Sequence, residues 1–266
     1  MSIVQQSHLW SNYLINKSSH FLVNIDVLGW FSYHPGHSCK HIRDSGSSRG
    51  DGEYWIDPEK NGNPLKVYCD MTNAEGKRWT IFLLNISGGW LLILNIVIDD
   101  SLSQTLNSPE MSYRKIDSYR NHNMIIANSA INELRSHLPF TQLRFHCNKQ
   151  HGRTIHMTTV ADSTGEAVIK YFTGQTETMP SSCGSFVRME DDNSYLTQLC
   201  NLWGKNHEGH YFSGTWSHQG MRELYDHPAF IVNLFHWVTL PEENRWECDD
   251  FLNQPSSGDF WKVYVR

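Results

Sequence analysis

A loop between two tryptophans carries the residues best suited to bind a small ligand. Residues 200–216 read CNLWGKNHEGHYFSGTW. Its polar side chains are Asn201, His207, His210 and Tyr211, and its indole rings are Trp203 and Trp216. Rings beside polar groups suit sugars, because the C–H faces of a sugar pack on aromatic rings while its hydroxyls form hydrogen bonds. We therefore predict a ligand-binding loop here. The alternative is that both tryptophans simply belong to the core.

Acidic turns are the second candidate sites. Calcium takes several carboxylate and carbonyl oxygens, which a tight acidic turn supplies. The candidates are Asp57, Glu59, Asn61 and Asn63 in one turn, Asp191 and Asp192 in an acidic run, and the pair Asp249 and Asp250 after Cys248. We expect calcium at one of these turns, although acidic turns are often only solvated and the sequence does not choose among them.

A third candidate is the tripeptide Arg49-Gly50-Asp51. Integrins bind this sequence when a tight loop presents its cation and carboxylate to a metal ion of the partner. The Gly/Ser-rich surroundings predict such a turn. An integrin is therefore a candidate partner, against the alternative that small and acidic residues merely turn the chain.

Several known catalytic motifs are missing from the sequence. It contains no phosphate loop and no Rossmann fingerprint, and His207 and His210 are spaced wrongly for H-E-x-x-H. We predict that the protein is not an enzyme. The net charge of −6 and the pI near 6.2 also disfavour nucleic-acid binding, which needs a basic face.

Six widely spaced cysteines without a C-x-x-C pair favour disulfides in an oxidising compartment over a zinc ribbon. Cys39 and Cys69 bracket two short apolar–polar alternating stretches, residues 53–56 and 65–68, separated by a polar turn. This pattern predicts a β-hairpin closed by a disulfide. Spacing alone does not determine how the other four cysteines pair.

The rest of the sequence predicts both strands and a helix. Residues 79–98 are uncharged and long enough to span a bilayer, but polar and glycine residues near the middle favour two buried strands over a membrane span. A helical stripe falls within residues 109–138, with Asn128 or Ser129 as N-cap. Strands are expected at 142–147, 154–160 and 167–172, and a closing strand at 259–266. Asn16 is a predicted glycosylation site.

The segment around the first two cysteines resembles the opening of a fibrinogen-like domain, and also the C-terminal propeptide of fibrillar collagens. The matching residues are Cys39, Gly52, Tyr54, Ile56, Pro58, Val67, Tyr68, Cys69, Asp70, Met71 and Thr72. The likeness is tight over 39–95, looser to 266 and absent over 1–38. It implies an α+β fold with a mainly antiparallel sheet, few short helices and disulfides Cys39–Cys69, Cys183–Cys200 and Cys147–Cys248.

The resemblance also implies a domain plan. Residues 1–38 are expected to form a variable N-terminal arm and 39–266 a fibrinogen-like domain. Within that domain, 39–78 form the stapled hairpin and 79–266 the central sheet and binding-loop region.

The implied function is non-catalytic recognition outside the cell, with glycans or matrix proteins as partners and calcium as the family's usual ion. The sequence also looks similar to cnidarian extracellular proteins, including coral skeletal organic matrix components, which implies a role in biomineralisation. The alternatives are a lectin of innate immunity using the 200–216 loop, and a collagen-propeptide-like module that assembles homo-oligomers. Because no signal peptide is visible, we expect the true start of a secreted protein to be missing.

Overall fold

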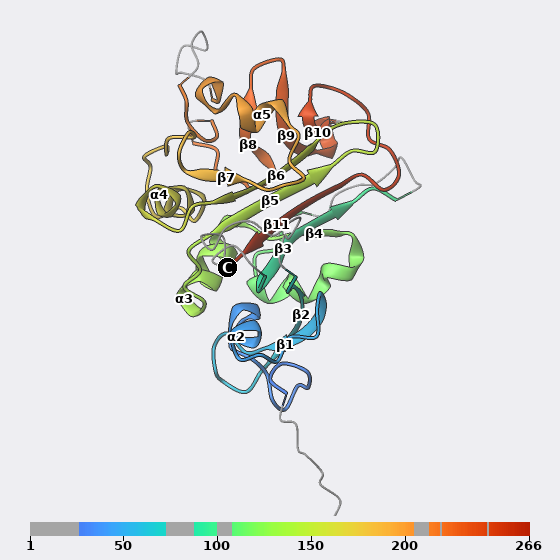
Figure 1. Cartoon of the computed structure of the whole chain (residues 1–266), viewed down its shortest axis with the longest axis vertical. Coiled ribbons are helices and arrows are strands. Elements are labelled where there is room, and N and C mark those ends of the chain that lie inside the picture. Colours follow the sequence, from blue (N-terminus) through green and yellow to red (C-terminus); the bar gives the residue numbers. More distant parts are fainter. Residues whose placement is uncertain (1–26, 73–87, 100–107, 205–212, 219, 244) are drawn as a thin grey trace, which may run out of the picture.

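A computed structural model describes residues 27–72, 88–99, 108–204, 213–218, 220–243 and 245–266. Its strands form two antiparallel sheets. The larger has eight strands in the order β1-β2-β3-β11-β5-β6-β7, with β4 paired to β3, and the smaller has the order β10-β9-β8 (Figure 1). The mainly antiparallel α+β fold class is therefore confirmed.

The strands of the large sheet are β1 Gly52–Ile56, β2 Leu65–Asp70, β3 Trp90–Val97, β4 Asn123–Ile125, β5 Leu143–Asn148, β6 Thr154–Thr159, β7 Phe186–Arg188 and β11 Phe260–Val265. Those of the small sheet are β8 Asp226–Ile231, β9 Phe235–Leu240 and β10 Arg245–Asp250. The α-helices are α2 Cys39–Asp44, α3 Asn128–His137, α4 Ser163–Phe172 and α5 Tyr195–Gln198. The 3-10 helices are η2 Tyr113–Asn121, η3 Cys200–Leu202 and η4 Pro241–Glu243.

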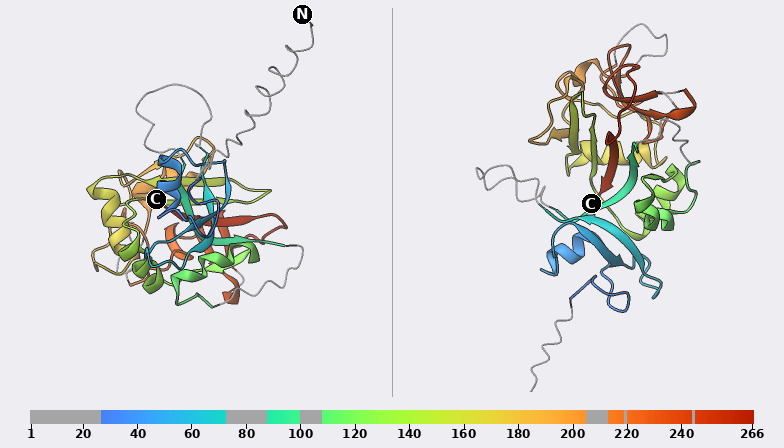
Figure 2. Two further views of the ribbon diagram at one scale, coloured as in Figure 1. Left: turned by 90° about the horizontal axis from the view of Figure 1, so that it is seen from below. Right: turned by 90° about the vertical axis from the view of Figure 1, so that its right-hand side faces the viewer.

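The predicted hairpin is formed by β1 and β2, and a disulfide joins Cys39 at the start of α2 to Cys69 in β2. Together with α2 it occupies one end of the molecule, and β8, β9 and β10 occupy the other (Figures 1 and 2). Buried and partly exposed side chains alternate along β2. Every second side chain therefore points into the core, as the sequence pattern predicts.

The fold begins before the predicted boundary at residue 38. Gly29 O accepts a hydrogen bond from Trp55 N at 2.7 Å, and Gly36 N donates to Trp55 O at 2.9 Å. The described part of the expected arm, residues 27–38, thus packs on β1 as part of the hairpin unit. Residues 1–26 lie outside the described residues.

The last strand lies in the middle of the large sheet. β11 pairs with β3 on one side and with β5 on the other. β3 is buried along almost its whole length, as expected for a continuous apolar strand in a central position. It is the second of the two strands predicted in 79–98; the first falls outside the described residues.

One strand prediction and one helix prediction are corrected. The segment 167–172, predicted as a strand, belongs to α4. Asp162 caps this helix by accepting from Thr164 N, and Gly165 is needed because a Cβ there would lie 1.9 Å from Val160 O. The α-helix within 109–138 is α3, preceded by the 3-10 helix η2, and its N-cap is Ala127, which makes no side-chain cap bond, instead of Asn128 or Ser129. Met124 and Ile125 instead form β4, because pairing with β3 supplies their backbone hydrogen bonds.

Aromatic side chains fill the space between the two sheets and α4. Trp203 and Trp216 contact each other edge to face at 5.0 Å between ring centroids, and Phe145 of β5 contacts both Trp216 and Trp237 at 5.4 Å. All four of these side chains are fully buried. Burial of such large rings dominates core energetics, so this cluster holds the two sheets together.

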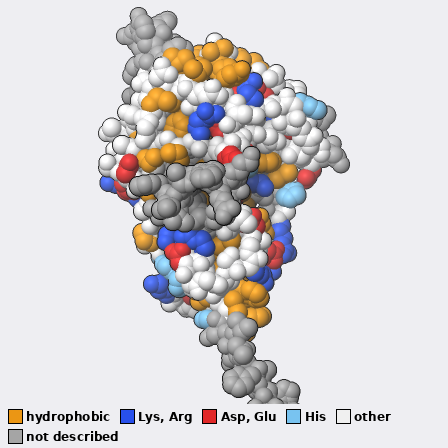
Figure 3. Space-filling view, in the orientation of Figure 1, with side chains coloured by type: hydrophobic (Ala, Val, Ile, Leu, Met, Phe, Trp, Pro, Cys, Tyr) orange, Lys and Arg blue, Asp and Glu red, His pale blue; other side chains and the backbone are white. Residues whose placement is uncertain are grey.

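No helix among the described residues is long and apolar enough to cross a membrane. On the face drawn in Figure 3, basic and acidic side chains lie next to one another. This mixture agrees with the modest net charge.

Candidate functional site

A polar cavity of about 280 Å³ opens where the β5–β6 turn meets the loop between β10 and β11. The residues lining it come from these two segments: Lys149, His151, Gly152, Arg153, Asp249, Asp250, Asn253, Gln254, Ser256 and Asp259. The disulfide Cys147–Cys248 joins the two segments just outside the cavity. Residues about a hundred positions apart are thereby held at one site.

Lys149 forms the buried floor of the cavity. Its Nζ donates to Asp250 Oδ2 at 2.7 Å and to the carbonyl oxygens of Trp246 and Asn253, each at 2.9 Å. An ammonium group has three N–H donors, so all of them have partners. The side chain is only 6% exposed. A buried charge with every donor satisfied is a fixed structural element.

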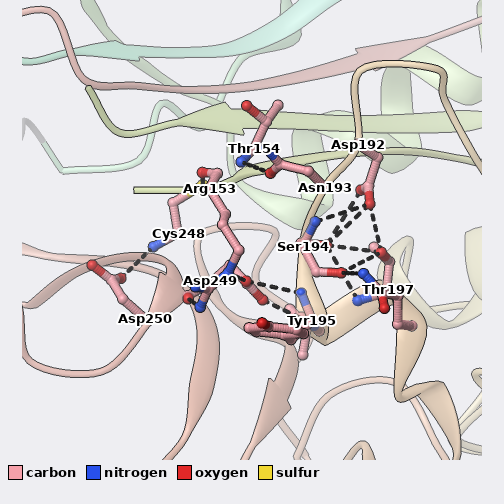
Figure 4. Close-up of polar contacts among 12 residues, drawn as sticks. Arg153, Thr154, Asp192, Asn193, Ser194, Tyr195, Thr197, Cys248, Asp249 and Asp250 are labelled. Carbon is pink, nitrogen blue, oxygen red and sulfur yellow. Dashed lines mark hydrogen bonds and ion pairs between the residues drawn. The ribbon is translucent and has the colours of Figure 1, made fainter. Parts of the chain in front are cut away.

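Arg153 forms one wall of the cavity. Its Nη2 donates to Asp249 O at 2.7 Å, its Nε bonds the Asp249 carboxylate, and its guanidinium lies 4.4 Å from the centre of the Tyr195 ring (Figure 4). Asp249 also accepts from the backbone N–H groups of Tyr195 and Leu196 at the start of α5. Burial raises the pKa of Asp249, against the lowering effect of Arg153 and the two N–H donors.

Asp259 fixes the opposite wall. Its Oδ1 accepts from Gln150 N at 2.7 Å and its Oδ2 from Ser256 N at 2.8 Å. The side chains of His151 and Gln254 remain exposed at the rim. The lysine and arginine side chains of the cavity are thus paired with aspartates, and polar side chains at its edge are exposed to solvent.

The predicted binding loop does not present its tryptophans to a ligand. Trp203 and Trp216 are fully buried in the aromatic core, so their prediction as stacking faces is wrong. Their indole N–H groups are also used, by Leu196 O and Ser185 Oγ. Asn201 lies in η3 and is exposed. The other predicted members, His207, His210 and Tyr211, lie outside the described residues.

In the first predicted calcium turn the oxygens already have partners. Asp57 accepts from the backbone N–H groups of Asn61 and Gly62 at 3.3 and 2.8 Å, while Glu59 points to Tyr113 and Arg114. Asn63 N donates to Asn61 Oδ1 at 2.9 Å. The structure thus gives these residues a turn-forming role, and their calcium binding stays a prediction.

The second predicted calcium site consists of Asp191 and Asp192, and the two residues have different roles. Asp192 is buried and accepts from His156 N, Arg188, Ser194 and Thr197, which fixes the turn before α5 (Figure 4). Its neighbour Asp191 is exposed and faces two histidines of β5 and β6. The two carboxylates therefore do not converge on one calcium ion.

Both charged side chains of the tripeptide Arg49-Gly50-Asp51 have intramolecular partners. Asp51 Oδ1 accepts from Met71 N and Thr72 N, each at 2.7 Å. Arg49 donates to Glu53 O at 2.7 Å, and its guanidinium lies 5.0 Å from the centre of the Trp30 ring. The structure uses these side chains to hold the hairpin, and integrin binding stays a prediction.

The three disulfides are Cys39–Cys69, Cys147–Cys248 and Cys183–Cys200, as the resemblance implies. Sequence reasoning nevertheless missed Lys149 and Arg153 as parts of a site. The signal was available, because the disulfide between Cys147 and Cys248 brings Lys149, two residues after the first, to Asp250, two residues after the second.

Sequence comparison places the likeness in the N-terminal part of the chain. A family model of the fibrillar collagen C-terminal domain matches residues 29–77. Fibrinogen-like protein A from Apostichopus parvimensis is 43% identical over 60 residues, which are 20% of this chain and 21% of that protein. The resemblance to fibrinogen-like proteins is confirmed. The match covers about a fifth of the length of this curated fibrinogen-like relative.

Solved fibrinogen-like structures were also aligned. The fibrinogen-like globe domain of human ANGPTL2 covers 87% of this chain and 99% of its own, with 13% identity and a TM-score of 0.37. That of human ANGPTL6 gives 12% identity and a TM-score of 0.35, over 87% of this chain and 95% of its own. Likenesses at this level add nothing to the assignment. Fibrinogen-like domains are generally non-enzymatic and typically belong to secreted proteins.

Proposed function

We propose that this chain is a non-catalytic extracellular recognition domain that binds a glycan, free or carried by a matrix protein, in the cavity between the β5–β6 turn and the β10–β11 loop. The observation that carries the proposal is a preformed polar cavity whose walls are held by a disulfide and by two ion pairs. Such preorganisation reduces the entropy lost when a ligand binds.

The pairing of charges favours a neutral ligand. Lys149 is bound to Asp250 and Arg153 to Asp249, so an ionic ligand has to compete with these pairs. A hydroxyl-rich ligand needs no counter-charge and adds hydrogen bonds to the lone pairs and rim groups that remain. The volume of about 280 Å³ lies at the lower end of ligand pockets and suits a single sugar unit.

Three disulfides that use all six cysteines support an oxidising compartment. Secretion, a place in the extracellular matrix and a role in biomineralisation follow from the resemblance and are part of the proposal. Calcium is proposed as an accessory ion, and its contribution is separated from glycan binding in the experiment below.

The test is a glycan array probed with the disulfide-intact full chain, in calcium and in EDTA. We expect specific binding to a small set of glycans. Binding that is lost in EDTA and restored by added Ca²⁺ assigns a role to calcium, and unchanged binding removes calcium from the proposal.

The affinity for the best glycan is then measured for a rim variant, His151→Ala combined with Gln254→Ala. Both side chains are exposed, so we expect an affinity at least about tenfold lower, equivalent to roughly 1.4 kcal/mol, with unchanged thermal stability. Asn132→Ala, on the exposed side of α3 at the other end of β5, is the matched control and retains binding. An array without specific binding, or wild-type affinity in the rim variant, would overturn the proposal.

A second candidate is chain assembly, which the match of residues 29–77 to the fibrillar collagen C-terminal domain favours. Assembly predicts trimers in sedimentation equilibrium at micromolar concentration. A monomer under these conditions would exclude it and leave the recognition proposal unchanged.

A further inference from the structure

Two histidines and one aspartate meet on the polar side of the large sheet. The strands β5, β6 and β7 form this edge of the sheet (Figure 1). His146 of β5 and His156 of β6 are register partners, so their side chains leave the sheet on the same side. Their rings are stacked with centroids 3.8 Å apart and an interplanar angle of 7°. Asp191 reaches them from the loop after β7.

The position of Asp191 is set by its surroundings. The next residue, Asp192, accepts from His156 N at 2.7 Å, and Met189 N donates to His156 O at 2.8 Å. The loop is thereby fastened to β6 on both sides of Asp191. Its Oδ1 lies 2.6 Å from His156 Nδ1 and its Oδ2 lies 3.7 Å from His146 Nε2.

The two separations from Asp191 are near those of ligands of one ion, and the stacked histidine rings have to rotate for both ring planes to meet at it. Zinc lies about 2.0–2.2 Å from imidazole nitrogen and carboxylate oxygen, so two ligands of one zinc ion are roughly 3.0–3.7 Å apart. The 3.7 Å gap between His146 and Asp191 already has this width and is too long for a hydrogen bond. The 2.6 Å contact between His156 and Asp191 has to open by less than about 1 Å.

Among the described residues, only one ring nitrogen of His156 has a hydrogen-bond contact. Its side chain is 8% exposed, and its Nε2 is buried without a hydrogen-bond partner among the described residues. No second bond therefore fixes its tautomer. A cation bound at Nδ1 takes the place of the contact with Asp191, Asp191 itself stays as a ligand of that cation, and the proton of the neutral imidazole then lies on Nε2.

Solvent reaches the cluster from one side, since the side chains of Asp191 and His146 are 57% and 22% exposed. Two cations neighbour it, and both are engaged elsewhere. Lys262, the register partner of His146 on β11, holds its Nζ 4.8 Å from the centre of the Phe260 ring, and Arg144 pairs with Asp70 at 2.5 Å.

We propose that His146, His156 and Asp191 form a binding site for a divalent transition metal ion of the zinc type, with one coordination position open to solvent. Two imidazoles and one carboxylate are the donor set that zinc takes in sites with an open position, whereas calcium prefers oxygen ligands alone. Metal binding ties the loop after β7 to β5 and β6. This site is independent of the glycan-binding cavity.

A second cluster of the same residue types, His227, His236 and Glu247, does not support the same inference. Glu247 is completely buried and both of its oxygens accept from Arg245, at 3.0 and 2.8 Å. A metal ion there has to displace the guanidinium of Arg245 from this buried carboxylate, so this cluster is a structural network.

The experiment uses the full, disulfide-intact chain and Zn²⁺ itself as the probe. The chain has fifteen histidines, so the proposed site has to be separated from background binding of Zn²⁺. Isothermal titration is expected to show one tight site, and Zn²⁺ is expected to raise the thermal midpoint relative to EDTA. Co²⁺ in the same site is expected to give visible d–d absorption.

Asp191→Asn is the decisive variant, since asparagine keeps the shape and an acceptor for His156 while removing the ligand charge. We expect zinc affinity at least about tenfold lower and loss of the Co²⁺ absorption. Glu190→Gln, which removes the same charge from the adjacent exposed residue, is the matched control and keeps both. His146→Gln is the second variant, with His137→Gln as its control.

Wild-type zinc affinity in Asp191→Asn and His146→Gln, with both variants folded, would overturn the proposal. The absence of a tight site in the wild-type titration would also overturn it. Neither result affects the glycan-array test.

Discussion

At the scale of single residues, buried charges in this protein are matched by specific partners. Glu247 of β10 has a completely buried side chain. It accepts from His236 Nδ1 at 2.6 Å, from Arg245, and from Leu252 N at 3.1 Å. Burial opposes ionisation of Glu247, but the hydrogen bonds from His236 and Arg245 outweigh it and lower its pKa from 4.5 to about 2. Its carboxylate therefore stabilises the folded state.

This shift predicts how stability depends on pH. A lowered carboxyl pKa contributes stability that is complete above the unfolded value of 4.5 and is lost as the pH falls toward 2. The size of the shift corresponds to about 3 kcal/mol. We expect Glu247→Gln to lose about this free energy of unfolding at pH 7 and to show a flatter dependence between pH 4.5 and 2. Urea unfolding at several pH values measures both effects.

The matched control for that variant is Glu243→Gln. Glu243 is 63% exposed and lies 4.0 Å from the same Arg245, so its removal is expected to change stability very little. Equal losses for the two variants would show that the buried carboxylate is not the stabilising group.

At the scale of elements, the β1–β2 hairpin is closed at three places: by the disulfide, by residues 27–38 on β1, and by Asp51. The two hydrogen bonds from Met71 N and Thr72 N and a third from Thr72 Oγ1, at 3.0 Å, join the start of β1 to the end of β2 through one carboxylate. The same residue ends the adhesion tripeptide. A structural role and an adhesive role therefore compete for one side chain.

Asp51→Ala is expected to lower the free energy of unfolding by roughly 1–3 kcal/mol, because it leaves two backbone N–H groups without their acceptor. Asp117→Ala is the control, since Asp117 is exposed and accepts a hydrogen bond from the side chain of the adjacent Ser118. Thermal and urea unfolding measure the loss. A stability equal to that of wild type would free Asp51 for a partner and favour the integrin prediction.

At the scale of the whole molecule, disulfides close loops of different lengths. Cys147–Cys248 spans 101 residues and joins the large sheet to the small one, while Cys39–Cys69 spans 30 and Cys183–Cys200 spans 17. A longer closed loop removes more conformational entropy from the unfolded chain. The bridge between the sheets should therefore matter most.

Replacing each cystine by two alanines tests this order. The chain-entropy relation predicts losses of about 4.7, 3.6 and 3.1 kcal/mol for the Cys147–Cys248, Cys39–Cys69 and Cys183–Cys200 pairs. Denaturant unfolding of the three variants measures them, and each variant serves as control for the others because the same atoms are removed. The largest loss at Cys183–Cys200 would contradict the entropic explanation.

Sequence patterns predicted elements whose signal is local. The alternation in residues 53–56, 65–68 and 259–266 corresponds to β1, β2 and β11. The segment 167–172 was misassigned because its apolar residues fit a strand as well as a helix, and the capping Asp162 lies just outside it. For the site, the acidic pair Asp249 and Asp250 was noticed, whereas its partners Lys149 and Arg153 were not.

By itself, the sequence determined the hairpin, the disulfide-forming chemistry of the cysteines and the fibrinogen-like relationship, because these depend on period-two patterns, residue types and motifs of consecutive residues. Only the tertiary structure decided that Trp203 and Trp216 are core residues, and that His146, His156 and Asp191 face one another. Strand register and sheet order set these contacts. They join residues far apart in the chain and leave no periodic signal in any one segment.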